Sequence, residues 1–148
     1  MRAAAPGHWD FEIEGCARFD TLFGSRRADL GSAGVYNAIG RSNISSPEVR
    51  VEIAPGKRFD AFVGYRAFWL AEPTDAFSTT GVRDASGRSS RFAGRQVDTR
   101  LRYWLVPGLL RGEVDVVWLA KGSFLAIAPN GPRTGDTHYL VTRLTATL

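Results

Sequence analysis

The chain has 148 residues, 44% of them hydrophobic, and a formal net charge of +4, which suits one ordinary domain over residues 1–148. No stretch of about 18 apolar residues occurs, so a membrane-spanning helix is excluded; a membrane-spanning β-strand is not, because its apolar residues alternate with polar ones. Cys16 is the single cysteine, which excludes a disulfide framework and a thiolate metal cluster. His8 and His138 are isolated and are expected to be strand-end residues. The sequence therefore predicts no metal and no cofactor.

Apolar and polar residues alternate along most of the chain, and this period of two predicts β-strands. In chain order the predicted strands cover residues 9–19, 48–54, 59–71, 95–106, 110–121 and 137–148. The stretch VDTRLRYWL, residues 97–105, illustrates the pattern, with charged side chains confined to even positions. No segment has a convincing helical period. The sequence therefore predicts an all-β chain of about six strands.

The predicted connections alternate between short and long. Two are tight turns, around Pro55-Gly56 and Pro107-Gly108. Three are long and rich in Gly, Ser, Asp and Arg, over residues 20–47, 72–94 and 122–136. An antiparallel transmembrane β-barrel of the bacterial outer membrane has this arrangement, with short periplasmic turns and long extracellular loops. Both chain ends are then expected on the periplasmic side.

The strand lengths and the aromatic residues agree with a membrane-spanning barrel. A tilted strand needs about 9 to 11 residues to cross the bilayer, and most of the predicted strands supply them. Aromatic residues of the apolar face lie near the short turns (Trp9, Phe59, Tyr103) and near the long loops (Phe19, Trp69, Trp118). A soluble β-sandwich or ligand carrier is the alternative, since alternation alone does not say which face points inward. The many charges on one parity and the long loops favour the membrane.

Several segments resemble a known family in order and spacing. They are NISSPEVRVEIAPGKRFDAFVGYRAFWLAEPTDAF, GVRDASGRSSRFAGRQVDTRLRYWLVPGLLR and the later LAKGSFL, APNGP and GDTHY. They are similar to the C-terminal part of the alginate export family of outer-membrane β-barrel proteins. The likeness extends from about Gly34 to Leu148 and is densest between Asn43 and Asp136. It implies a large barrel in the bacterial outer membrane that passively passes an anionic polysaccharide such as alginate, or a related polar solute, without enzymatic chemistry.

The chain departs from the family pattern in three respects. Six strands are too few to enclose a channel, which takes about eight strands or more. The N-terminal stretch MRAAAPGHWDFEIEG has no apolar core of a signal peptide. The final residue is Leu148, where the family usually has an aromatic residue. We therefore expect an incomplete C-terminal part of a larger barrel, whose alternating Leu140, Leu144, Ala146 and Leu148 engage the barrel-assembly machinery.

A channel for a polyanion is expected to present cations along its path. The cations on the polar parity are Arg18, Arg50, Arg66, Arg100, Arg102, Arg111, Lys121 and Arg143, and the acids are Asp10, Glu12, Glu14, Glu52, Asp60, Asp98, Glu113 and Asp115. The two sets cancel in charge, so most members are expected to form cross-strand ion pairs. The candidate substrate-path residues are Arg66, Arg100, Arg102, Arg111 and Arg143, with Arg100 and Arg102 foremost.

The long loops supply the remaining candidates. Arg83, Arg88 and Arg91 are expected either to bind an anionic sugar or to belong to a loop that folds over the mouth, with an ordinary solvated loop as the alternative. The loop 122–136 has the same two interpretations. Nucleic-acid binding is disfavoured, because most aromatic residues lie on the face opposite the arginines. Besides the exporter, a general porin-like channel or a purely structural barrel stays open, with outer-membrane lipid as a partner in each case.

Overall fold

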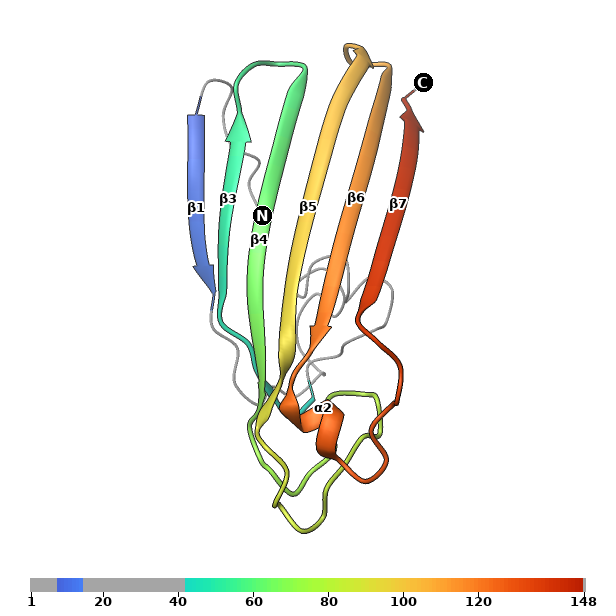
Figure 1. Cartoon of the computed structure of the whole chain (residues 1–148). Coiled ribbons are helices and arrows are strands. Elements are labelled where there is room, and N and C mark those ends of the chain that lie inside the picture. The colour runs from blue at the N-terminus through green and yellow to red at the C-terminus, as the bar shows by residue number, and fades with distance from the viewer. Residues whose placement is uncertain (1–7, 15–41, 148) are drawn as a thin grey trace.

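The computed structural model describes the backbone of residues 8–14 and the whole of residues 42–147. It is mostly β, with six long strands in one antiparallel sheet (Figure 1). The strands are β1 (His8–Glu14), β3 (Glu48–Ala54), β4 (Phe59–Leu70), β5 (Phe92–Val106), β6 (Leu110–Lys121) and β7 (Thr137–Ala146), paired in this order. A two-residue strand, β2 (Ile44–Ser45), pairs with β4. The prediction of about six antiparallel strands is confirmed.

The sheet is open rather than closed into a barrel in the described part of the chain. Strands β1 and β7 are its two edges, and each inner strand pairs with its neighbours in the sheet. The prediction of a barrel is therefore not met by this sheet alone. Six strands are too few to close into a barrel, because about eight strands are needed to enclose an interior just wide enough for side chains.

The strand boundaries follow the predicted ones closely. Strands β3 and β6 match at both ends, β4 ends one residue early, and β5 begins three residues early at Phe92. Strand β7 ends at Ala146, and β1 ends at Glu14, with the predicted continuation to residue 19 outside the described residues. Both predicted short connections are confirmed, since four residues join β3 to β4 and three join β5 to β6. In the second, Leu109 N–H donates to the Val106 carbonyl at 3.0 Å, and Gly108 has the positive φ of 75° that glycine tolerates.

The two faces of the sheet have opposite chemistry, and the apolar face is the exposed one. Leu101 is 50% exposed and Leu140 is 70% exposed, whereas Arg66 is 2% and Asp98 1% exposed. We call the apolar side the outward face and the charged side the polar face. A soluble sheet buries its apolar face and leaves the charged one in water. This sheet does the reverse.

A small hydrophobic core lies where the long connections meet the strands, at the lower end of Figure 1. Its buried members are Ile44, Phe68, Leu70, Phe77, Val82, Ala93, Phe124 and Ala128. One of them, Phe124, belongs to the helix α2 (Ser123–Ile127). The prediction that no segment is helical is wrong here, because a five-residue helix is too short to produce a recognisable helical period. None of the helices in the described residues is long and apolar enough to span a membrane.

Candidate functional site: the polar face of the sheet and its loops

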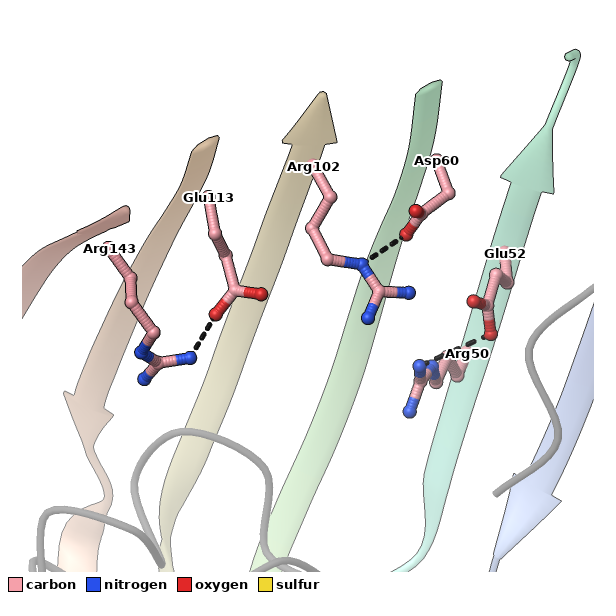
Figure 2. Close-up of polar contacts among 6 residues, drawn as sticks. All are labelled: Arg50, Glu52, Asp60, Arg102, Glu113 and Arg143. Carbon is pink, nitrogen blue, oxygen red and sulfur yellow. Dashed lines mark hydrogen bonds and ion pairs between the residues drawn. The ribbon is translucent and has the colours of Figure 1, made fainter. Parts of the chain in front are cut away.

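Four charged residues form one row across the polar face. Asp60, Arg102, Glu113 and Arg143 occupy the same level on β4, β5, β6 and β7. Their signs alternate, and Figure 2 shows the two ion pairs, Arg102 Nε to Asp60 Oδ1 at 2.5 Å and Arg143 to Glu113. We call this row the ionic rung. Cross-strand pairs of opposite charge contribute about 0.2–1 kcal/mol each, so one pair stabilises the register of β4 with β5 and the other that of β6 with β7.

A second set of charges is buried closer to the loops. Arg66 forms an ion pair with Glu48, and Asp98 accepts a hydrogen bond from Gln96 Nε2 at 3.0 Å. Gly64 provides the room for both carboxylates, because an added Cβ would lie 3.0 Å from Glu48 Oε1 and 3.1 Å from Asp98 Oδ1. Burial of separate charges is unfavourable unless they are paired, so these groups depend on one another.

Three arginines of the polar face stack on aromatic rings. Phe62 lies between the guanidinium carbons of Arg50 and Arg100, at 3.9 Å and 4.6 Å from the ring centroid. Arg111 lies over Trp104 at 5.5 Å. The Nε atoms of Arg100 and Arg111 are buried without a hydrogen-bond partner, and neither side chain forms an ion pair with another described residue. Stacking fixes the plane of a guanidinium while its N–H groups stay oriented for an anion.

The two long connections, residues 71–91 and 122–136, pack against each other. The Phe77 and Phe124 rings are 6.3 Å apart. Asn130 adds two hydrogen bonds, since its Oδ1 accepts from Arg83 N–H at 2.9 Å and its Nδ2 donates to the Gly81 carbonyl at 2.9 Å. A cavity of about 220 Å³ lies where these connections meet the ends of β4, β5 and β6. We call the two connections together the loop unit, because they share one core.

A protein-family model described as alginate export matches residues 2–137. The chain belongs to the alginate export family. The match begins nearer the N-terminus than the expected start at Gly34, and it ends at residue 137 rather than at Leu148. A comparison with curated proteins found no match.

Alginate export is a transport family and not a catalytic one. In the described ranges, no three His, Cys, Asp or Glu side chains gather as they would around a metal ion. The arrangement of the polar face is electrostatic, with fixed cations and acids on a rigid sheet. Such a surface can hold or guide a charged solute without breaking a bond.

The structure separates the candidate path residues of this alginate export chain into two groups. Arg66, Arg102 and Arg143 form ion pairs with carboxylates, and Arg66 is almost completely buried. Arg100 and Arg111 stack on rings instead. Three of the expected cross-strand ion pairs are present among the described residues, and Arg100 and Arg111 are the two candidates outside them.

Two of the three loop candidates hold the loop unit together. Arg83 Nε donates to the Thr74 carbonyl at 2.7 Å, and Arg91 Nε donates to the Leu70 carbonyl at 3.1 Å. Arg88 is exposed. Its guanidinium has no hydrogen bond or ion pair to the rest of the chain that the structure describes. Arg88 is thus the loop candidate that is not engaged in holding the loop unit together.

Two important polar-face residues were not among the candidates. Glu48, the partner of Arg66, shares the parity of Arg50 and Glu52, a signal that could have identified it. Phe62 is apolar on the charged parity, and that irregularity marks the ring on which two arginines stack. Arg50 was counted among the charges of this face, and it is ion-paired with Glu52 at 3.2 Å (Figure 2).

Asp84 organises the tip of the loop unit, and its titration gives a testable pH dependence. Its carboxylate accepts hydrogen bonds from Ser86 Oγ at 2.6 Å, Ser86 N–H at 2.9 Å and Ser89 N–H at 2.7 Å. The hydrogen bonds from Ser86 and then Ser89 lower the pKa of Asp84 well below its usual range. The folded pKa is lower than the unfolded one, so this stabilisation is complete above about pH 4 and is lost as the pH falls further.

We expect the amide protection of Ser86 and Ser89 in hydrogen exchange, corrected for intrinsic rates, to be constant from pH 8 to pH 5 and to fall below pH 4. Asp84→Ala should remove the protection at every pH. Asp75→Ala is the matched control, since the Asp75 carboxylate accepts only its own neighbour's N–H, from Ala76 at 2.8 Å, among the described residues. Protection in Asp84→Ala equal to that of the parent would contradict the assignment.

Proposed function

We propose that this sheet is part of the wall of an outer-membrane barrel through which an anionic polysaccharide such as alginate passes by diffusion. The observation that carries the proposal is the inversion of the two faces. Exposed apolar residues cover the outward face, and charged residues line the polar face. Family membership supports a transport role. In this arrangement lipid covers the outward face and the solute moves along the polar face.

The outward face is suited to lipid in both size and composition. The exposed apolar side chains extend from β3 to β7, including Val51, Val63, Leu101, Val116 and Leu140. A contiguous apolar surface of this kind is uncommon on soluble proteins and marks an interaction surface. The charged and buried opposite face also argues against a soluble β-sandwich or ligand carrier, since such a fold would bury the apolar residues.

The two edges of the sheet support its place in a larger wall. Unpaired backbone N–H and C=O groups in lipid cost several kcal/mol each, so edges of β1 and β7 facing lipid require further strands beside them. The outward residues Leu140 and Leu144 of β7 are 70% and 66% exposed. We propose that this alternating apolar row is the part that the barrel-assembly machinery recognises. The short turns then face the periplasm and the loop unit faces the cell exterior.

A general porin-like or structural barrel is the second candidate, and the ion pairs of the polar face favour it. Glu48, Asp60 and Glu113 each neutralise an arginine that would otherwise attract a polyanion. Under this alternative the polar face is a cross-linked wall without selectivity. The exporter instead assigns Arg100 and Arg111 the role of contacting carboxylates of the polysaccharide.

The deciding experiment has two stages. The first locates the native protein in fractionated cells, with the outer-membrane fraction expected. The second records conductance of the purified protein in planar bilayers with and without added polyuronate. An exporter is expected to show a polyuronate block, whereas a general porin conducts salt equally well with and without it. Recovery of the protein only in the soluble fraction would refute both membrane functions.

Replacing Arg100 tests the residue assignment. Arg100→Gln should raise the half-blocking polyuronate concentration about tenfold, because a hydrogen bond to a charged group contributes about 1.5–3 kcal/mol and about 1.4 kcal/mol corresponds to tenfold. Arg58→Gln is the control, since Arg58 is exposed beside the short turn after β3. An equal shift in both variants would show that overall charge, and not Arg100, determines the block.

A further inference from the structure

The outward face carries a single strongly charged side chain on the described strands β3 to β7. Arg95 is exposed there and pairs in register with two other outward positions, Ala67 and Ala120. Aspartate, glutamate, lysine and the other arginines of these strands lie on the polar face. A charge on an apolar surface needs either water or an opposite charge beside it.

Arg95 belongs to a row of side chains at the loop end of the sheet. Its guanidinium carbon lies 6.0 Å from the centroid of the Trp118 ring on β6. His138 on β7 pairs in register with Trp118, and their rings are stacked with centroids 6.4 Å apart and an interplanar angle of 2°. We call Arg95, Trp118 and His138 the interface row. Asp136 also touches it, because Trp118 Nε1 donates to its Oδ2 at 3.2 Å.

The carboxylate of Asp136 is held by N–H donors of the chain, and it forms no ion pair with Arg95. Its other oxygen, Oδ1, accepts the Lys121 N–H at 3.1 Å. Asp136 therefore helps to fix the position of the Trp118 indole, while Arg95 is exposed on the outward face. Among the described residues Arg95 has no ion pair.

The distance from the short-turn end of the apolar row to the interface row agrees with the thickness of the apolar band of an outer-membrane barrel. The outward row of β5 begins at Leu105, which is 53% exposed; from there to Arg95 the strand runs ten residues, about 33 Å along the strand and roughly 25 Å along the membrane normal at a tilt of about 40°. An outer-membrane barrel has an apolar band of about 25 Å between two aromatic girdles, and the bacterial outer membrane is thinner than average. Arg95 is thus placed at the headgroups of the leaflet on the loop side.

We propose that the interface row binds the phosphate group of an outer-leaflet lipid headgroup, with Arg95 as the charged contact and Trp118 and His138 as its stacked support. This proposal rests on the proposed function, because it requires the outward face to lie in lipid. Arginine is suited to the task, since its planar fork pairs with phosphate through two N–H groups while its face stacks on an aromatic ring. Phosphate-bearing lipid is the one occupant that combines the opposite charge with a place at this depth.

The test uses protein purified from outer membranes, placed in phosphatidylcholine nanodiscs that contain either phosphorylated lipid A or lipid A stripped of its phosphates. Lipid retained on the protein is counted by native mass spectrometry. The parent should retain the phosphorylated lipid only, and Arg95→Gln should retain about fivefold less, the factor that corresponds to about 1 kcal/mol for one basic residue at an anionic lipid surface. Arg133→Gln, an exposed loop arginine, is the matched control and should behave as the parent.

Equal retention of the two lipids, or equal losses in Arg95→Gln and Arg133→Gln, would overturn the proposal. Displacement of the lipid by millimolar inorganic phosphate would also overturn it, since the site would then be one for the free ion. These outcomes leave the proposed function intact, because the protein was first recovered from the outer membrane. Failure of that recovery would instead refute the proposed function.

Discussion

Replacement of Arg66 by methionine is expected to lower the free energy of unfolding by about 3–5 kcal/mol, the usual cost of removing one partner from a buried ion pair. Arg66 is 2% exposed and paired with Glu48, and Asp98 lies on the other side of Gly64. Without the guanidinium, two buried carboxylates face each other across a glycine. The measurement is urea unfolding of the protein in phospholipid vesicles.

A second variant separates charge from packing. Arg66→Met combined with Glu48→Gln should recover at least half of the loss, because one of the opposed carboxylates is then neutral. If Arg66 instead served mainly to contact the solute, the single variant would unfold within about 1 kcal/mol of the parent, and only the polyuronate block would change. The buried position of Arg66 argues for the first result.

Replacement of Phe124 by alanine is expected to destabilise the loop unit by about 3–5 kcal/mol, which is typical for truncation of a buried phenylalanine. Phe124 is 0% exposed and packs on Phe77, so its loss opens a cavity in the core that both connections share. We expect rapid proteolysis within residues 71–91 and 122–136, while the strands stay protected. Mass mapping of the fragments measures this.

Ile127 provides the matched control for Phe124 on the same helix. It is 65% exposed, so Ile127→Ala should change the stability by less than about 0.5 kcal/mol and leave the proteolysis unchanged. Cleavage confined to residues 122–136 in Phe124→Ala would contradict the shared core, because the connection 71–91 would then be folded independently.

The six long strands of this chain are predictable because each of them carries a period of two over at least seven residues, whereas the two-residue β2 is too short to show one. Strand β5 is the clearest example, since even positions from Gln96 to Trp104 face one side. The pattern could not show which side is buried, because that depends on what lies against each face. The exposures of Leu101 and Asp98 supply this information, and they support the membrane interpretation over the soluble one.

The loop unit and the pairing of Arg66 could not be predicted from the sequence in the same way. The hydrogen bond from Arg83 to Asn130 joins residues 47 positions apart, and no local pattern encodes such a contact. Glu48 opens the predicted strand 48–54 on the parity of Arg50 and Glu52, but only the structure shows that it pairs with Arg66. Five arginines were proposed for the solute path on parity alone, and only the contacts distinguish the stacked Arg100 from the ion-paired Arg102.

The alternating signs of the ionic rung have a consequence for how strands find their alignment. A slip of one residue between β5 and β6 would turn Arg102 or Glu113 towards the apolar outward face, where an unpaired charge is costly, so the misaligned pairing would be less stable. The side chain of Arg143 is 50% exposed at the free edge of β7, so a strand arriving at this edge meets a cation at a fixed height. A neighbouring strand with an acidic residue at this register position is favoured, and one with a lysine or arginine there is disfavoured. The charges of the ionic rung thus favour one register of the strands over registers shifted by one residue.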